Sequence, residues 1–102
     1  MSEQTFPQYS VDGPGAPRFA VLMLSERGGQ QNAFEPTRAT EAMSESQALE
    51  FLESIARRQQ PDWVEIGDND LVLQLSEREL IVYRESFWTG NRLVRVVVGQ
   101  LR

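Results

Sequence analysis

The spacing of hydrophobic and polar residues changes from helical to alternating near Pro61. Before Pro61, one segment carries apolar residues along a single side of a helix: Ala48, Leu49, Phe51, Leu52, Ile55 and Ala56. Ser44 and Gln47 have the spacing of a capping box, and Pro61 cannot continue a helix. The pattern therefore predicts an amphipathic helix over 45–59.

Beyond Pro61, apolar residues recur in four short runs that are typical of strands. The predicted strands cover 63–66, 71–75, 80–85 and 92–98. Their connections are short and rich in turn-forming residues, so neighbouring strands must run antiparallel. The last part of the chain is thus predicted to be a four-stranded meander.

The segment before the helix divides into three parts. Residues 1–17 are rich in proline and glycine and predict a flexible N-terminal arm. Residues 19–24 are apolar at both parities, which is typical of a strand covered on both faces. Residues 33–40 allow a short strand at an edge of the sheet, because proline, here Pro36, is tolerated only at an edge. We predict one α+β domain over 18–102, with a single amphipathic helix packed on a mainly antiparallel sheet. Whether strand 19–24 joins the meander is left open.

Pairing the strands symmetrically about their turns gives the predicted sheet two faces. The first is apolar except for Arg84 and Arg95 and suits the helix; it holds Val64, Ile66, Leu71, Leu73, Leu75, Leu80, Val82, Leu93 and Val97. The second holds Trp63, Glu65, Val72, Gln74, Ile81, Tyr83, Val94, Val96 and Val98. A slip of one residue would exchange the faces of the slipped strand.

The second face is too apolar to be left in water. One helix cannot cover both sides of a sheet, so something else must cover this face. The sequence leaves three possibilities open: the N-terminal arm through Phe6 and Tyr9, a second copy of the chain, or a different partner or ligand.

Composition narrows the chemistry that this chain can perform. The sequence contains no histidine, cysteine or lysine, and these side chains supply most general bases near neutral pH and all thiolate or Schiff-base nucleophiles. No motif joins the remaining carboxylates, hydroxyls and arginines into a site. Asp68-Asn69-Asp70 has oxygen ligands that suit calcium, but the rest of an EF-hand is missing and a hairpin turn is favoured. We expect no enzyme activity, no cofactor and no metal.

Charge and hydropathy limit the partners. The net charge of −5 argues against duplex DNA binding. No apolar run approaches the ~20 residues that span a bilayer, and the first residues lack the pattern of a signal peptide. We therefore expect a cytoplasmic protein with no membrane partner, and nucleic acid is an unlikely ligand.

Aromatic residues and arginines gather in the last third of the chain, as in the hot spots of protein interfaces. The candidate partner-binding residues are Trp63, Tyr83, Arg84, Phe87, Trp88, Arg92 and Arg95. Two other interpretations stay open for the 87–92 segment. Phe87 and Trp88 could seal the end of the core, or they could stack on single-stranded nucleic acid.

These observations favour a non-enzymatic, protein-binding accessory or regulatory module that associates with itself. A first alternative is an inhibitor or immunity-type protein whose acidic surface docks on a basic site. A second is a small enzyme or ligand-binding protein with a pocket on the face shared by Trp63 and Tyr83, where Tyr83 and Glu65 would act as acid and base.

Overall fold

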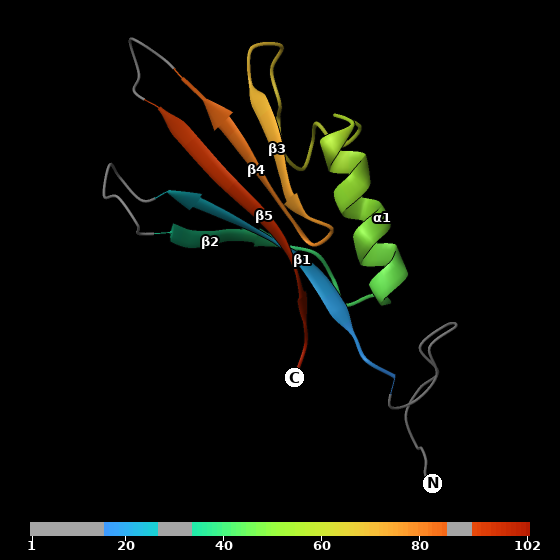
Figure 1. Cartoon of the computed structure of the whole chain (residues 1–102). Helices are drawn as coiled ribbons and strands as arrows, with labels where there is room; N and C mark the ends of the chain where they lie inside the picture. Colours follow the sequence, from blue (N-terminus) through green and yellow to red (C-terminus); the bar gives the residue numbers. More distant parts are fainter. Residues whose placement is uncertain (1–15, 27–33, 86–90) are drawn as a thin grey trace, which may run out of the picture.

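A computed structural model describes residues 16–26, 34–85 and 91–102 of the chain. Its elements, in chain order, are β1 (Phe19–Glu26), β2 (Phe34–Ala39), α1 (Glu45–Ala56), β3 (Leu71–Ser76), β4 (Glu79–Arg84) and β5 (Arg92–Gln100). The strands form one antiparallel sheet in the order β2-β1-β5-β4-β3, with α1 on one side (Figure 1). The predicted α+β class is confirmed.

The structure places the first strand in the sheet and removes one of the predicted strands. β1 lies in the middle of the sheet between β2 and β5, which settles where strand 19–24 belongs. Residues 63–66 are not a strand: the amides of Trp63 and Val64 both donate to the carbonyl of Gln60, at 3.0 and 2.9 Å, and close a turn after Pro61. The C-terminal meander therefore has three strands rather than four, and Val64 reaches the core from this turn.

The helix begins as the sequence predicts. The Gln47 amide donates to Ser44 Oγ at 3.2 Å and the Ser44 amide donates to Gln47 Oε1 at 3.1 Å, which completes the capping box. The helix ends earlier than predicted, because Arg58 adopts a left-handed conformation with φ of 62°. The described part of the chain contains no helix with the length and apolarity that crossing a bilayer would need.

The core lies between α1 and the sheet. α1 packs chiefly on β1, β4 and β5, the three strands in the middle of the sheet. The buried apolar side chains are Phe19, Val21, Ala48, Leu52, Ile55, Val64, Leu80, Val82, Val94, Val96 and Val98. Each large side chain removed from water in this way contributes roughly 1.5–3 kcal/mol to folding, so this layer accounts for most of the hydrophobic stabilisation.

The register of β3 against β4 corrects the predicted faces. At the turn, Ser76 pairs with Glu79, as symmetric pairing requires, but one step further Gln74 pairs with Leu80. Leu75 is therefore an extra residue in β3, a bulge that shifts the rest of the strand by one position. The leucines of β3 turn away from the core, and Leu75 itself is 55% exposed.

β5 is shifted in the same sense against β4. Val82 pairs with Val94, whereas the symmetric register would place Arg95 opposite it. Val94, Val96 and Val98 consequently lie under the helix, where the sequence had placed Leu93 and Val97. The observed register keeps the Arg95 guanidinium out of the apolar core, where an unpaired charge would be costly.

Candidate protein-binding surface

The sheet face opposite α1, which we call the open face, takes residues from all five strands. They alternate with the core residues: Ala20, Leu22, Leu24, Phe34, Leu71, Leu73, Glu79, Ile81, Tyr83, Leu93, Arg95 and Val97. The central members are partly exposed, and Leu71 and Leu73 are 57% and 49% exposed. Contiguous apolar surface of this kind marks interaction sites.

Charged residues interrupt the apolar surface at two places. Glu26 lies at the end of β1, opposite Phe34, and an ion pair lies nearer the middle. Arg95 Nε donates to Glu79 Oε2 at 2.7 Å, and the Arg95 guanidinium lies 5.5 Å from the centre of the Phe34 ring. The pair joins β5 to β4, and the ring contact joins β5 to β2 across β1. The two charges offset each other, so the middle of the open face carries no net charge.

The predicted partner-binding residues that lie within the described part of the chain are divided between the two sides of the sheet. Tyr83 and Arg95 lie on the open face, beside Leu93 and Ile81 respectively. Arg84 and Arg92 pair across β4 and β5, and by strand parity they share the helix side with Val82. Tyr83 and Arg95 therefore lie on the opposite side of the sheet from Arg84 and Arg92.

Trp63 lies on the helix side of the molecule. Its ring meets that of Phe51 edge to face, with centroids 5.3 Å apart and planes at 88°. Arg38 Nη1 donates to the carbonyl oxygens of Asp62 and Trp63, both at 2.8 Å, and its guanidinium lies 5.9 Å from the Trp63 ring centre. Trp63 and Tyr83 therefore do not share a sheet face, which corrects the predicted location of a pocket between them.

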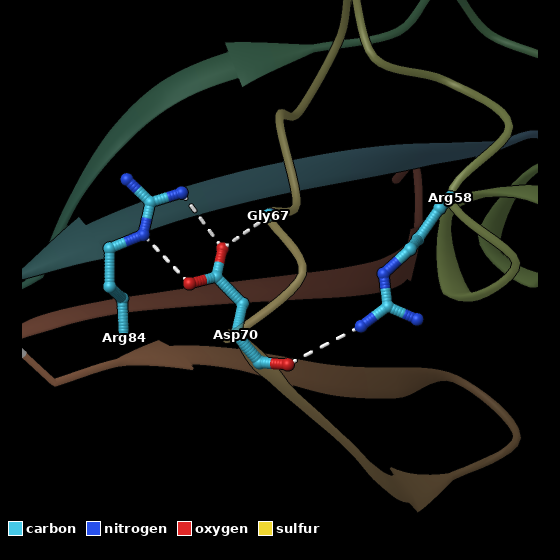
Figure 2. A network of polar contacts seen from close by, with 4 residues as sticks. All are labelled: Arg58, Gly67, Asp70 and Arg84. Carbon is cyan, nitrogen blue, oxygen red and sulfur yellow. Dashed lines mark hydrogen bonds and ion pairs between the residues drawn. The ribbon is translucent and has the colours of Figure 1, made fainter.

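Arg84 is held by Asp70 (Figure 2). Arg84 Nε and Nη2 donate to the two oxygens of this carboxylate at 2.7 and 2.8 Å, and the Gly67 amide donates to Asp70 Oδ2 at 2.7 Å. Arg58 Nη2 donates to the Asp70 backbone carbonyl at 3.3 Å. The bond from Arg84 is the main reason that the Asp70 pKa falls to about 2, although burial of the carboxylate opposes the shift. The Arg84–Asp70 ion pair therefore connects strand β4 to the turn that precedes β3.

This network also bears on the calcium interpretation of the 68–70 segment. Both Asp70 oxygens are occupied by arginine and amide donors, while Asp68 and Asn69 are exposed. Across residues 16–26, 34–85 and 91–102, no three carboxylates gather in a way that could hold a metal ion. The segment forms a turn, in which the Asp70 amide donates to the Gly67 carbonyl at 3.1 Å. It does not close a hairpin as predicted, because residues 63–66 are not a strand.

The helix side has an open groove at the edge of the sheet. It lies between α1 and the end of β3 and has a volume of about 380 Å³. Its lining residues are Leu49, Leu52, Glu53, Gln74 and Glu77. Leucines form its apolar part, and two carboxylates give it negative charge.

Sequence reasoning missed the contribution of the first two strands to the open face. Leu22 and Leu24 come from β1, and Phe34 comes from β2. Residues 19–24 are apolar at both parities, which indicated that both faces of this strand are covered. The sequence did not indicate which strands lie beside β1, so these residues could not be assigned to a particular surface. The predicted loop aromatics Phe87 and Trp88 lie outside the described residues.

Comparison with protein-family descriptions, with curated proteins and with solved structures finds no significant match to this chain.

Proposed function

We propose that this chain is a non-enzymatic, protein-binding accessory module, and that the open face binds a second copy of the chain. The observation that carries the proposal is the apolar surface that extends over all five strands on the side away from α1. Apolar contact area is the main source of affinity in stable protein complexes. In this proposal the module acts in the cytoplasm, as its sequence led us to expect.

The charge distribution allows a second copy to bind at the open face. The chain carries a net charge of −5, so two copies repel each other over most of their surfaces. The Glu79–Arg95 pair leaves the centre of the open face neutral. Two such faces related by a two-fold axis can approach without repulsion at that centre.

Size sets the expected strength of this contact. Five strands, about 4.8 Å apart with about 3.3 Å per residue, give a face of roughly 500 Å² over six residues. Two faces together cover roughly 1,000 Å² in projection, close to the lower limit for specific complexes. The dimer should therefore dissociate on dilution, with a Kd on the order of micromolar.

The test is the molecular mass of full-length variants in sedimentation equilibrium, from about 1 to about 200 µM. Leu22→Glu places a charge on the open face beside Val97 and should give a monomer at every concentration. Gln59→Glu adds the same charge at an exposed position after α1 and should dimerise like the wild-type chain.

A wild-type chain that stays monomeric throughout this range contradicts self-association. So does a Leu22→Glu variant that dimerises normally. Circular dichroism of both variants verifies that the fold is retained.

A further inference from the structure

The two edges of the sheet differ in how well they are protected. β2, at one edge, contains Pro36, which cannot donate a ladder hydrogen bond, as well as Glu35 and Arg38. β3, at the other edge, contains neither proline nor charge: its sequence is Leu-Val-Leu-Gln-Leu-Ser. Proline and charge are the usual means of preventing another strand from pairing at an edge. The bulge at Leu75 also limits pairing at the end of β3. The backbone donors and acceptors of residues 71–74, before the bulge, lack such protection.

β3 is accessible on the open face and, at Gln74, on the helix side, where its neighbour Val72 packs against the core. Leu71 and Leu73, on the open face, are 57% and 49% exposed. Gln74, on the helix side, is exposed and lines the groove against α1. A strand added along β3 would thus have an apolar neighbour on one face and a groove on the other.

The groove determines which side chains such a strand should carry. Leu49 is half-buried and offers contact to the aliphatic part of a long side chain, and Glu53 and Glu77 offer carboxylates to its end. Glu53 Oε2 lies 3.0 Å from Arg57 Nε, but both side chains are more than half exposed, so this pair is weak and easily exchanged. A basic side chain with an aliphatic stem fits this combination.

We propose that the β3 edge binds an extended segment of a partner protein whose side chains alternate between apolar and basic. Side chains of a strand point alternately to the two faces of the sheet. The apolar ones would extend the open face beside Leu71 and Leu73, while arginine or lysine would enter the groove. The backbone of the segment would pair with β3, as in strand addition.

This inference goes beyond the self-association proposed above, because it uses the edge of the sheet rather than its face. It is therefore tested in the full-length Leu22→Glu background, where dimerisation through the open face is removed. Binding there can succeed or fail independently of the dimer.

The probe is a fluorescent peptide of about seven residues, the length of a typical strand, with alternating valine and arginine. Its anisotropy is followed at low salt as protein is added. We expect saturable binding by this peptide, no binding by its valine–glutamate counterpart, and at least about tenfold weaker binding by a peptide in which the same residues are not alternated. Equal binding by the alternating and rearranged peptides would show simple attraction to an acidic protein and overturn the proposal.

Methylation of the peptide amides tests the backbone pairing. One version of the valine–arginine peptide carries N-methyl groups at its odd-numbered residues, and a second version carries them at its even-numbered residues. Because alternate amides of a strand point to opposite sides, we expect one version to lose binding and the other to keep it. Binding by both versions, or by neither, would contradict edge pairing.

Variants of the protein test the groove. Glu77→Gln and Glu53→Gln should each lower the affinity for the valine–arginine peptide by about three- to fivefold, as expected for partly exposed ion pairs. Glu50→Gln removes the same charge from an exposed position of α1 outside this groove and should leave the affinity unchanged. An equal loss in all three variants would mean that only the net charge matters, and would overturn the assignment to the groove.

Discussion

Asp70 shows how much one side chain contributes to the shape of this domain. Its carboxylate is 1% exposed, and the Arg84 side chain that pairs with it is 37% exposed. Asp70 accepts bonds from β4 and from the amide of Gly67, so the turn before β3 is fixed at both ends. Burying a carboxylate is costly unless charged donors replace the lost water, and here two guanidinium nitrogens do so.

The pH dependence of folding should report this pair. Hydrogen bonding from Arg84 lowers the Asp70 pKa from 3.8 to about 2. A carboxylate with a lowered pKa stabilises the fold fully above its unfolded value and loses this effect as the pH falls through the folded value. The stabilisation should therefore be present above pH ~4 and disappear towards pH ~2; it amounts to about 2 kcal/mol.

Asp70→Asn isolates this contribution from the other acidic residues. Urea denaturation of the variant and the wild type should differ by about 2 kcal/mol near neutral pH, and by much less near pH ~2. If the free energies of unfolding of the two proteins differed equally at both pH values, the charge of Asp70 would not be what stabilises the turn.

At the level of the elements, local signals were sufficient for the start and the buried side of α1, but not for its end or for the sheet register. The Ser44–Gln47 capping box and the apolar stripe define the helix without reference to other elements. In β3 the sequence predicts the turn pairing correctly, and the bulge at Leu75 then reverses the faces. In β5, valine occupies both parities, so no sequence pattern marked which side was buried. In β3, alternation favours burial of the three leucines, and the structure exposes them instead.

The register can be tested with two neighbouring valines of β5. Val96 is fully buried and Val97 lies on the open face. Val96→Thr places a hydroxyl in the core and should lower the free energy of unfolding by about 1–3 kcal/mol. Val97→Thr should change it by no more than about 0.5 kcal/mol when measured at a concentration that favours the monomer. The reverse order of the two effects would restore the symmetric register and contradict the structure.

At the level of the whole molecule, the predicted α+β architecture is correct, while the residues assigned to the two sheet faces differ from those predicted. The sequence shows that one helix cannot cover a sheet that is apolar on both sides. It does not show that β1 enters the middle of the sheet, which places Leu22 and Leu24 next to Val97 and Arg95. The pairing of distant segments depends on the total burial that each arrangement achieves, and no local pattern contains that information.

The central claim is that a second copy of the chain covers the open face. Because the natural chain has no cysteine, Val97→Cys introduces a single thiol at the middle of this face. The most direct measurement is the rate at which this thiol reacts with a disulfide reagent over a range of protein concentrations. The same measurement on Glu50→Cys, at an exposed position of α1, serves as the control.

We expect the thiol at position 97 to react quickly in dilute protein and progressively more slowly as the concentration rises through the micromolar range, while the control rate stays constant. A fast rate at every concentration would mean that the open face remains in water. A slow rate at every concentration would mean that the chain covers the face itself. Either result would contradict the account.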